Sequence, residues 1–204
     1  MDDKSDTVPQ LVQCPAVSSL SQSLLKAKLL IDIFSLVPQH LPAIDSLLDD
    51  RFGPARQNRT AYRLREGAAL LTDFSFVAMH GDQLVGSVQC WPIRLKSVGG
   101  SRMPLILLGP VAVAAAREGQ AIGTALMRAS LAAIDSATSP PVLLIGDSPY
   151  YGRFGFSAAS TRNWELPGPV DHDRLLLRGP TTGLPRIAWV QAGSVNPSRA
   201  AKVA

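Results

Sequence analysis

The sequence has few of the residues that build metal centres and disulfide frameworks. Its 204 residues include two cysteines and three histidines. Cys14 and Cys90 lack the paired spacing of a metal site, and the histidines, His40, His80 and His172, are too far apart to share one helix face. We therefore expect no metal ion, and we expect a reduced, cytoplasmic protein.

Long apolar runs are lacking as well. No stretch of about 18 apolar residues occurs, so we expect no membrane span. The opening segment MDDKSDTVPQ is acidic and polar, which does not fit a secretory signal. The sequence also contains no internal repeat. Apolar residues nevertheless make up 46% of the chain, which is enough to fill the core of one domain.

The charge of the chain is only weakly biased, with a formal net charge of +4 and 6% aromatic residues. A mild basic excess suits an acidic small ligand. Aromatic residues do not interleave with the basic ones, as they do where proteins bind single-stranded nucleic acid. We therefore expect no nucleic-acid partner.

The periodicity of apolar residues predicts a mixed α/β domain over residues 29–180. Residues 1–28 have no clear period and are expected to form a loosely ordered extension, and residues 181–204 a partly irregular C-terminal segment. Strands are expected at 29–36, on both sides of a turn at 80–82, at 103–113, at 141–146 and at 175–178. Helices are expected at 42–53, 56–66 and 124–137, so helices should cover both faces of the sheet.

A glycine-containing turn, REGQAIG, joins the expected strand at 103–113 to the helix that follows. The free N–H groups at such a helix start attract an anion, and small residues let a phosphate approach the backbone. A plain strand-to-helix turn is the alternative interpretation. Pro110 lies inside the strand, where it cannot donate a ladder hydrogen bond. It predicts a bulge or a local parting of strands, whose free N–H groups an amide-bearing ligand can use.

Three stretches together, GPVAV, REGQAIGTALM and VLLIGDSPYYGRFGF, resemble the GNAT superfamily of acyl-CoA-dependent N-acyltransferases. The likeness is greatest to its bacterial YhbS-like branch, and it runs in the same order from residue 30 to about residue 180. The resemblance implies a GNAT fold, in which a central sheet of about six to seven strands is splayed between its fourth and fifth strands.

The resemblance also implies where acetyl-CoA or another acyl-CoA would bind. Its pantetheine amides would pair with the strand at Val111, Ala112 and Val113. Its pyrophosphate would rest on the N–H groups of the loop, which are those of Gly119, Gln120, Ala121, Ile122, Gly123 and Thr124. The loop departs from the usual family pattern at Glu118, where Gln or Arg is common, and at Ala121, where the first glycine usually stands.

The segment GDSPYYGRFGF is expected to form a short helix, with Asp147 as its cap, Pro149 in its first turn and Gly155 at its end. By resemblance, Tyr151 matches the tyrosine that donates a proton to the leaving thiolate, which is a general-acid role. The alternative is that both Tyr150 and Tyr151 are packing residues with a solvated hydroxyl.

Five arginines gather before and within the expected helix at 56–66, namely Arg51, Arg56, Arg59, Arg63 and Arg65. A solvated helix face explains this pattern. The alternative is a docking site for an acidic substrate or for an acidic acyl carrier protein, because this region borders the acceptor site in GNAT folds.

The leading hypothesis is an N-acetyltransferase acting on a small-molecule or protein amine. The alternatives are an acyltransferase that uses carrier-protein thioesters and a non-catalytic binding module. A homodimer is possible on general grounds.

Overall fold

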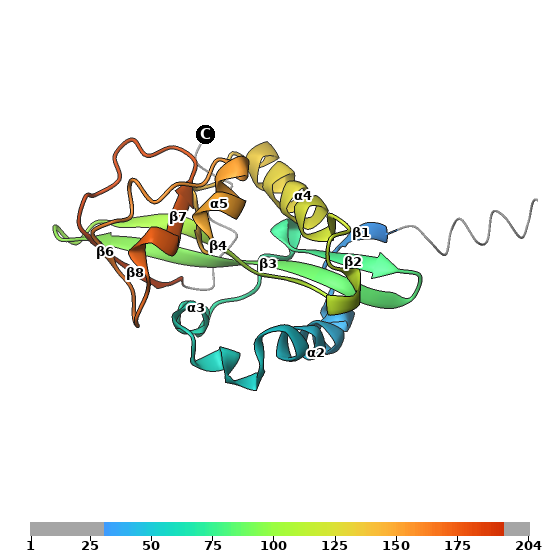
Figure 1. Cartoon of the computed structure of the whole chain (residues 1–204). Coiled ribbons are helices and arrows are strands. Elements are labelled where there is room, and N and C mark those ends of the chain that lie inside the picture. Colours follow the sequence, from blue (N-terminus) through green and yellow to red (C-terminus); the bar gives the residue numbers. More distant parts are fainter. Residues whose placement is uncertain (1–30, 194–204) are drawn as a thin grey trace, which may run out of the picture. The chain divides into compact units, whose positions relative to one another are not determined.

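A mixed sheet of eight strands forms the centre of the chain (Figure 1). The computed structural model describes residues 31–193, so the expected extension at 1–28 and Cys14 lie outside the described residues. The strand order is β1-β2-β3-β4-β5-β7, and β8 pairs with both β3 and β6. The strands are β1 (Ile31–Ser35), β2 (Phe76–His80), β3 (Gln83–Ser97), β4 (Arg102–Val113), β5 (Val142–Ile145), β6 (Trp164–Glu165), β7 (Leu175–Arg178) and β8 (Ala188–Ala192).

Strand β3 organises the sheet because its outer edge is shared by two partners. Its first half pairs with β2 as far as Val88, and its second half, from Ile93, pairs with β8. Strand β8 lies beyond residue 180, where the domain was expected to end, so part of the C-terminal segment is a strand of this sheet. The sequence IAWVQA lies between Pro185 and Gly193, but it is a short apolar run without strict alternation, so it does not by itself predict a strand.

Helices α2 (Leu41–Phe52) and α4 (Ile122–Ser136) cover opposite faces of the sheet (Figure 1), which confirms the expected layering. Helix α2 packs on Val77, whereas α4 packs with the next residue, Ala78. Neighbouring residues of a strand face opposite sides. Gly53 has a φ of 75° and ends α2, as expected from the sequence.

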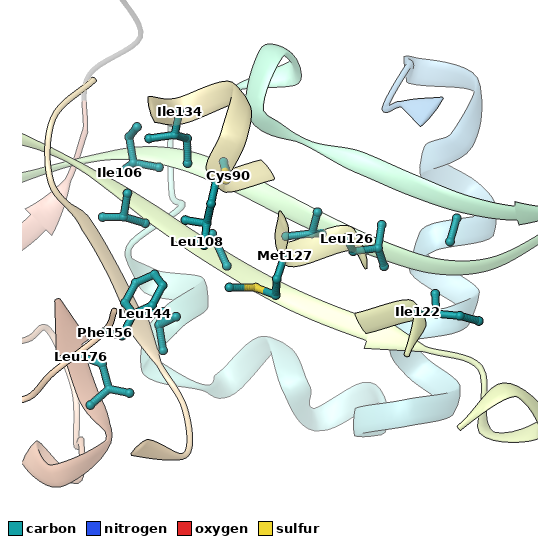
Figure 2. Close-up of a cluster of buried hydrophobic side chains, with 14 of the residues drawn as sticks. Cys90, Ile106, Leu108, Ile122, Leu126, Met127, Ile134, Leu144, Phe156 and Leu176 are labelled. Atoms are coloured by element: carbon teal, nitrogen blue, oxygen red, sulfur yellow. The ribbon is translucent and has the colours of Figure 1, made fainter. Parts of the chain in front are cut away.

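The core beneath α4 contains the side chains that the helical period predicted. Leu126, Leu131 and Ile134 are buried there, together with Ile122 and Met127. Figure 2 shows this cluster, in which residues of α4 meet strand residues such as Leu108 and Leu144. The period-3.6 pattern therefore placed the buried face of α4 correctly.

The prediction of a second helix at 56–66 is wrong. The structure has a 3-10 helix at Pro54–Asn58 and a single-turn helix, α3 (Thr60–Arg63), separated by Arg59 in an extended conformation. Contacts with a distant segment override the helical propensity: Thr60 donates to the carbonyl of Pro169 at 2.6 Å, and Arg63 donates to that of Pro167 at 2.7 Å. Consequently, the arginines of this segment do not share one helix face.

Cys90 provides a test of burial in the core. Its thiol is fully buried and lies 3.4 Å from the hydroxyl of Ser130, and burial raises the pKa of Cys90 to about 12. The unfolded chain loses this proton near pH 9 while the folded chain keeps it, so stability falls as the pH rises above about 9. We expect urea denaturation to give a free energy of unfolding that falls by up to about 1.4 kcal/mol per pH unit above that point. In Cys90→Ala the decline should begin about one pH unit higher, where the unfolded chain loses the proton of Tyr151, whose pKa burial raises from 10 to about 12. An unchanged profile would contradict the assignment.

No helix within 31–193 is long and apolar enough to cross a membrane. Within the same part of the chain, no three His, Cys, Asp or Glu side chains gather closely enough to hold a metal ion.

Candidate active site

Strands β4 and β5 separate in the middle of the sheet. They pair in parallel at only two positions, Ile106 with Val142 and Leu107 with Leu143, and β4 then continues to Val113. Its pairing with β3 shifts between Val111 and Leu108, at the Gly109–Pro110 step. This irregularity is the bulge that the proline predicted.

The free edge of β4 presents two backbone N–H groups to the gap. Ala114 donates its N–H to Val85, which lies just across on β3, at a distance of 2.8 Å. Because successive N–H groups along a strand alternate in direction, those of Val111 and Val113 face away from β3. No other strand of the described chain lies along this edge beyond Leu107. These amides can therefore pair with an extended, amide-bearing ligand.

A second set of free amides lies at the start of α4. The first intrahelical hydrogen bond runs from Ala125 to Ala121, so the N–H groups of residues 122–124 have no helical acceptor. Gly119, Gln120 and Ala121 are exposed. The structure therefore has the accessible, amide-rich helix start that the sequence predicted, and the helix dipole favours an anion there.

Ala121 adopts a left-handed conformation, with a φ of 57°. This conformation costs a non-glycine residue about 1–2 kcal/mol, and the lower flexibility of alanine in the unfolded chain offsets part of that cost. We therefore expect Ala121→Gly to raise the free energy of unfolding by about 0.5–1 kcal/mol in urea denaturation. Ala132, exposed in the middle of α4, is the matched control, and Ala132→Gly should lower it by about 1 kcal/mol. A loss of stability in both variants would contradict the inference that the backbone is strained at Ala121.

Glu118 is neutralised from outside the loop. Its carboxylate pairs with Arg51 of α2. The negative charge of Glu118, which departs from the family pattern, is therefore compensated by Arg51, and this weakens its effect on the amides of the loop. Arg117, on the other side, lies 2.9 Å from the ring of His80.

A cleft of about 540 Å³ opens where β4 and β5 part. Residues from Leu107 to Val111 form one wall, and residues from Ile145 to Asp147 form another. Tyr151 from α5 (Ser148–Tyr151) lines the same cleft. The remaining lining comes from Phe52 of α2, from the arginine-containing segment 56–65 and from residues 169–174. Its volume suits a small-molecule site.

Tyr151 is held against the backbone on one side and by aromatic rings on the other. A β-carbon at Gly146 would lie 2.7 Å from Cδ2 of Tyr151, so only glycine leaves room for the ring there. The rings of Tyr150 and Phe156 lie 4.8 and 6.2 Å away, both edge to face. Burial raises the pKa of Tyr151 to about 12, and the negative charge of Asp147 acts in the same direction. The phenol therefore keeps its proton at physiological pH.

The helix that carries Tyr151 begins and ends largely as predicted. Pro149 lies in its first turn, and Gly155 ends the following 3-10 turn with a φ of 84°. Asp147 occupies the N-cap position, but its side chain makes no capping hydrogen bond. It forms an ion pair with Arg174 instead, at 3.1 Å, because that guanidinium lines the same cleft.

The structure brings some of the expected site residues together and separates others. Val113 and the hydroxyl of Tyr150 lie at 3.7 and 3.2 Å from the position that a β-carbon of Gly123 would take, so the end of β4 meets the start of α4. Of the residues expected to bind the cofactor, Val111 lines the cleft with Tyr151, whereas the loop at 119–124 does not. Ala112 faces the opposite side and packs with α2.

Arg153 is a candidate that sequence reasoning missed. Its guanidinium donates to the side chain of Thr124 at 3.1 Å and lies 4.0 Å above the ring of Tyr150. This arrangement puts a cation at the edge of the free amides, where it can also attract an anion. An arginine next to an aromatic pair was the available signal, but only the fold brings it to a loop 29 residues earlier in the chain.

The parted sheet, the amide-rich helix start and the tyrosine in the cleft define a GNAT domain. The acetyltransferase (GNAT) domain family matches residues 36–159, which is more than half of the chain, so this protein belongs to that family.

Named relatives agree with this assignment. The uncharacterized N-acetyltransferase YhbS of Escherichia coli K12 is 27% identical over 124 residues, which are 61% of this chain and 72% of that protein. An uncharacterized N-acetyltransferase of Streptomyces avermitilis is 32% identical over 109 residues, or 53% of this chain. The matched region spans only 26% of the length of that relative.

Solved structures give the same fold. The E. coli YhbS structure in complex with CoA has a TM-score of 0.63 at 24% identity, and the match covers 80% of this chain and 89% of that one. A GNAT acetyltransferase from Brucella melitensis in complex with acetyl-CoA has a TM-score of 0.52 at 28% identity, with 74% and 96% covered.

Proposed function

We propose that this protein is an acyl-CoA-dependent N-acyltransferase that uses acetyl-CoA and transfers the acyl group to an amine by direct attack. One observation carries the proposal: the free edge of β4 leads from an amide-rich helix start to a cleft that contains Tyr151. Solved GNAT structures that contain CoA or acetyl-CoA support the same choice of donor.

The donor would be held by backbone groups at both ends of its arm. The N–H of Val113 would pair with the pantetheine arm, the N–H of Val111 would face the thioester, and those of residues 119–124 would bind the pyrophosphate. Arg153 would add a positive charge beside the pyrophosphate. The role of the chain is to bring the thioester and the amine into reaction geometry.

In the transfer step, the lone pair of the amine forms a C–N bond to the thioester carbonyl, and the C–S bond breaks. The N–H of Val111, which lines the cleft with Tyr151, stabilises the negative charge that develops on the carbonyl oxygen. Tyr151 donates its proton to the departing thiolate, the attacking nitrogen releases a proton to water, and water then returns a proton to the Tyr151 phenolate. A phenol of pKa about 12 is a weak acid for this task, but a bound donor would bury the thiolate as well and raise the pKa of the thiol toward it.

The test of the donor site is a pair of variants at Thr124, in the first turn of α4. Thr124→Asp adds a charge that favours the helix start but repels a diphosphate, whereas Thr124→Asn adds a similar shape without the charge. We expect calorimetric titration with CoA to give an affinity at least about tenfold weaker for Thr124→Asp and within about threefold of wild type for Thr124→Asn.

Three outcomes separate the proposal from its alternatives. Equal CoA affinity in both variants and in wild type would contradict the binding of the diphosphate to this loop. CoA binding without thiol release across a panel of amines would indicate a non-catalytic module. Activity with an acyl-pantetheine carrier protein, in the absence of CoA binding, would indicate a carrier-protein donor.

A further inference from the structure

Two arginines of the cleft, Arg59 and Arg65, have no acidic partner within residues 31–193, and of these two Arg59 is exposed whereas Arg65 is half-buried. Arg65 lines the cleft, and its Nε atom is buried without a hydrogen-bond partner. None of the ion pairs recorded within residues 31–193 includes Arg65. The indole N–H of Trp91, whose ring lies 5.7 Å from the Arg65 guanidinium, is also buried without an acceptor. This neighbourhood has donors in excess, and burying a charge without a partner is costly.

Arg65 is held in place by a chain of contacts that begins on α2. Asp49 accepts a hydrogen bond from Arg56 at 2.7 Å, and Arg56 in turn donates to the hydroxyl of Tyr62. The guanidinium of Arg65 lies 4.2 Å above the ring of Tyr62. A guanidinium fixed in this way, and without a carboxylate partner, has the planar geometry that matches a carboxylate in two hydrogen bonds.

The other arginines of the cleft differ from Arg65 either in having acidic partners or in being exposed. Arg56 is buried and paired with both Asp45 and Asp49, and Arg174 is paired with Asp147. Arg59 is exposed and lies 5.4 Å from the ring of Phe52. Burial lowers the pKa of Arg65, and the positive charge of Arg56 acts in the same direction, whereas a bound anion would act against both.

We infer that Arg65 binds a carboxylate of the acceptor, so that the acceptor is a small amine that carries a carboxyl group, in the manner of an amino acid. This inference rests on the proposed function, since it identifies the second substrate of the same cleft. The amine would lie toward Tyr151 and the parted strands, and the carboxylate would lie toward the arginine-containing segment.

The experiment measures carboxylate binding directly and does not depend on turnover. Product-like probes, namely N-acetylglycine, N-acetyl-β-alanine and N-acetyl-γ-aminobutyrate, are titrated calorimetrically beside their carboxamides. We expect at least one carboxylate to bind wild-type protein about tenfold or more tightly than its carboxamide. In Arg65→Met the ratio should fall to about two or less, and in Arg65→Lys it should be intermediate because the charge remains but the fork is lost.

Arg128→Met is the matched control, because Arg128 is exposed on α4 and its replacement changes the net charge by the same amount. It should keep the wild-type ratio. The inference is overturned if no carboxylate is preferred by wild type, or if the preference survives in Arg65→Met. CoA binding and thiol release are measured on the same samples. Their loss would contradict the proposed function, whereas a missing carboxylate preference with intact CoA binding would contradict only the role of Arg65.

Discussion

We expect Tyr151→Phe to lower kcat for the proposed acyl transfer by about 100-fold or more and to change the affinity for acetyl-CoA by less than about twofold. The ring and its packing stay, so only the proton that the phenol donates to the thiolate is lost, and general acids contribute rate factors of this size. Thiol release under saturating donor gives kcat, and calorimetric titration gives the affinity.

Tyr150→Phe is the matched control, since Tyr150 directly precedes Tyr151 in the same helix but its hydroxyl occupies a different position. Its hydroxyl lies against Gly123 rather than in the cleft. We expect kcat of this variant to stay within about fivefold of wild type, because it loses no reacting proton. If the two variants have equal kcat values, Tyr151 is a packing residue and another group protonates the thiolate.

Gly146→Ala should lower activity by displacing the ring of Tyr151, without removing its hydroxyl. The added methyl would lie 2.7 Å from Cδ2 of Tyr151 and closer still to Cε2, so the ring must move. The ring is confined by Tyr150 and Phe156. Overpacking of this kind costs about 1–3 kcal/mol of stability. We expect that loss in urea denaturation, together with a fall in kcat at least as large as that of Tyr151→Phe.

Gly152→Ala provides the comparison, because a β-carbon at Gly152 meets nothing within 4 Å and its φ of −56° is ordinary for alanine. This variant should be as stable and as active as wild type. Wild-type kcat in Gly146→Ala would mean that the position of the Tyr151 ring does not matter for catalysis.

The sequence predicted the part of the site that local backbone chemistry determines. A proline inside an apolar strand indicated the bulge at Pro110, because proline cannot join the ladder there. Small residues before a helical period indicated the open amides from Gly119 onward. Pro149 and Gly155 indicated the beginning and the end of the short helical segment that carries Tyr151. Each of these signals lies within a few residues of the feature that it produces.

The acceptor side of the cleft depends on contacts between distant segments, and the sequence predicted it poorly. Five nearby arginines look alike in a sequence, whereas the structure buries Arg56 against two carboxylates and leaves Arg65 without one. The break at Arg59 follows from hydrogen bonds that span more than a hundred residues, such as that of Thr60 to the carbonyl of Pro169. Helical periodicity carries no information about such partners.

The late position of β8 has a consequence for synthesis on the ribosome. Lys96 of β3 pairs with Trp189, so half of one edge of β3 has no partner until the nascent chain has grown by more than ninety further residues. During that interval a row of unsatisfied backbone groups is available to a neighbouring nascent chain. Chains arrested before β8 would therefore be the species most prone to aggregate, and a chaperone that covers this edge would improve the yield of folded protein.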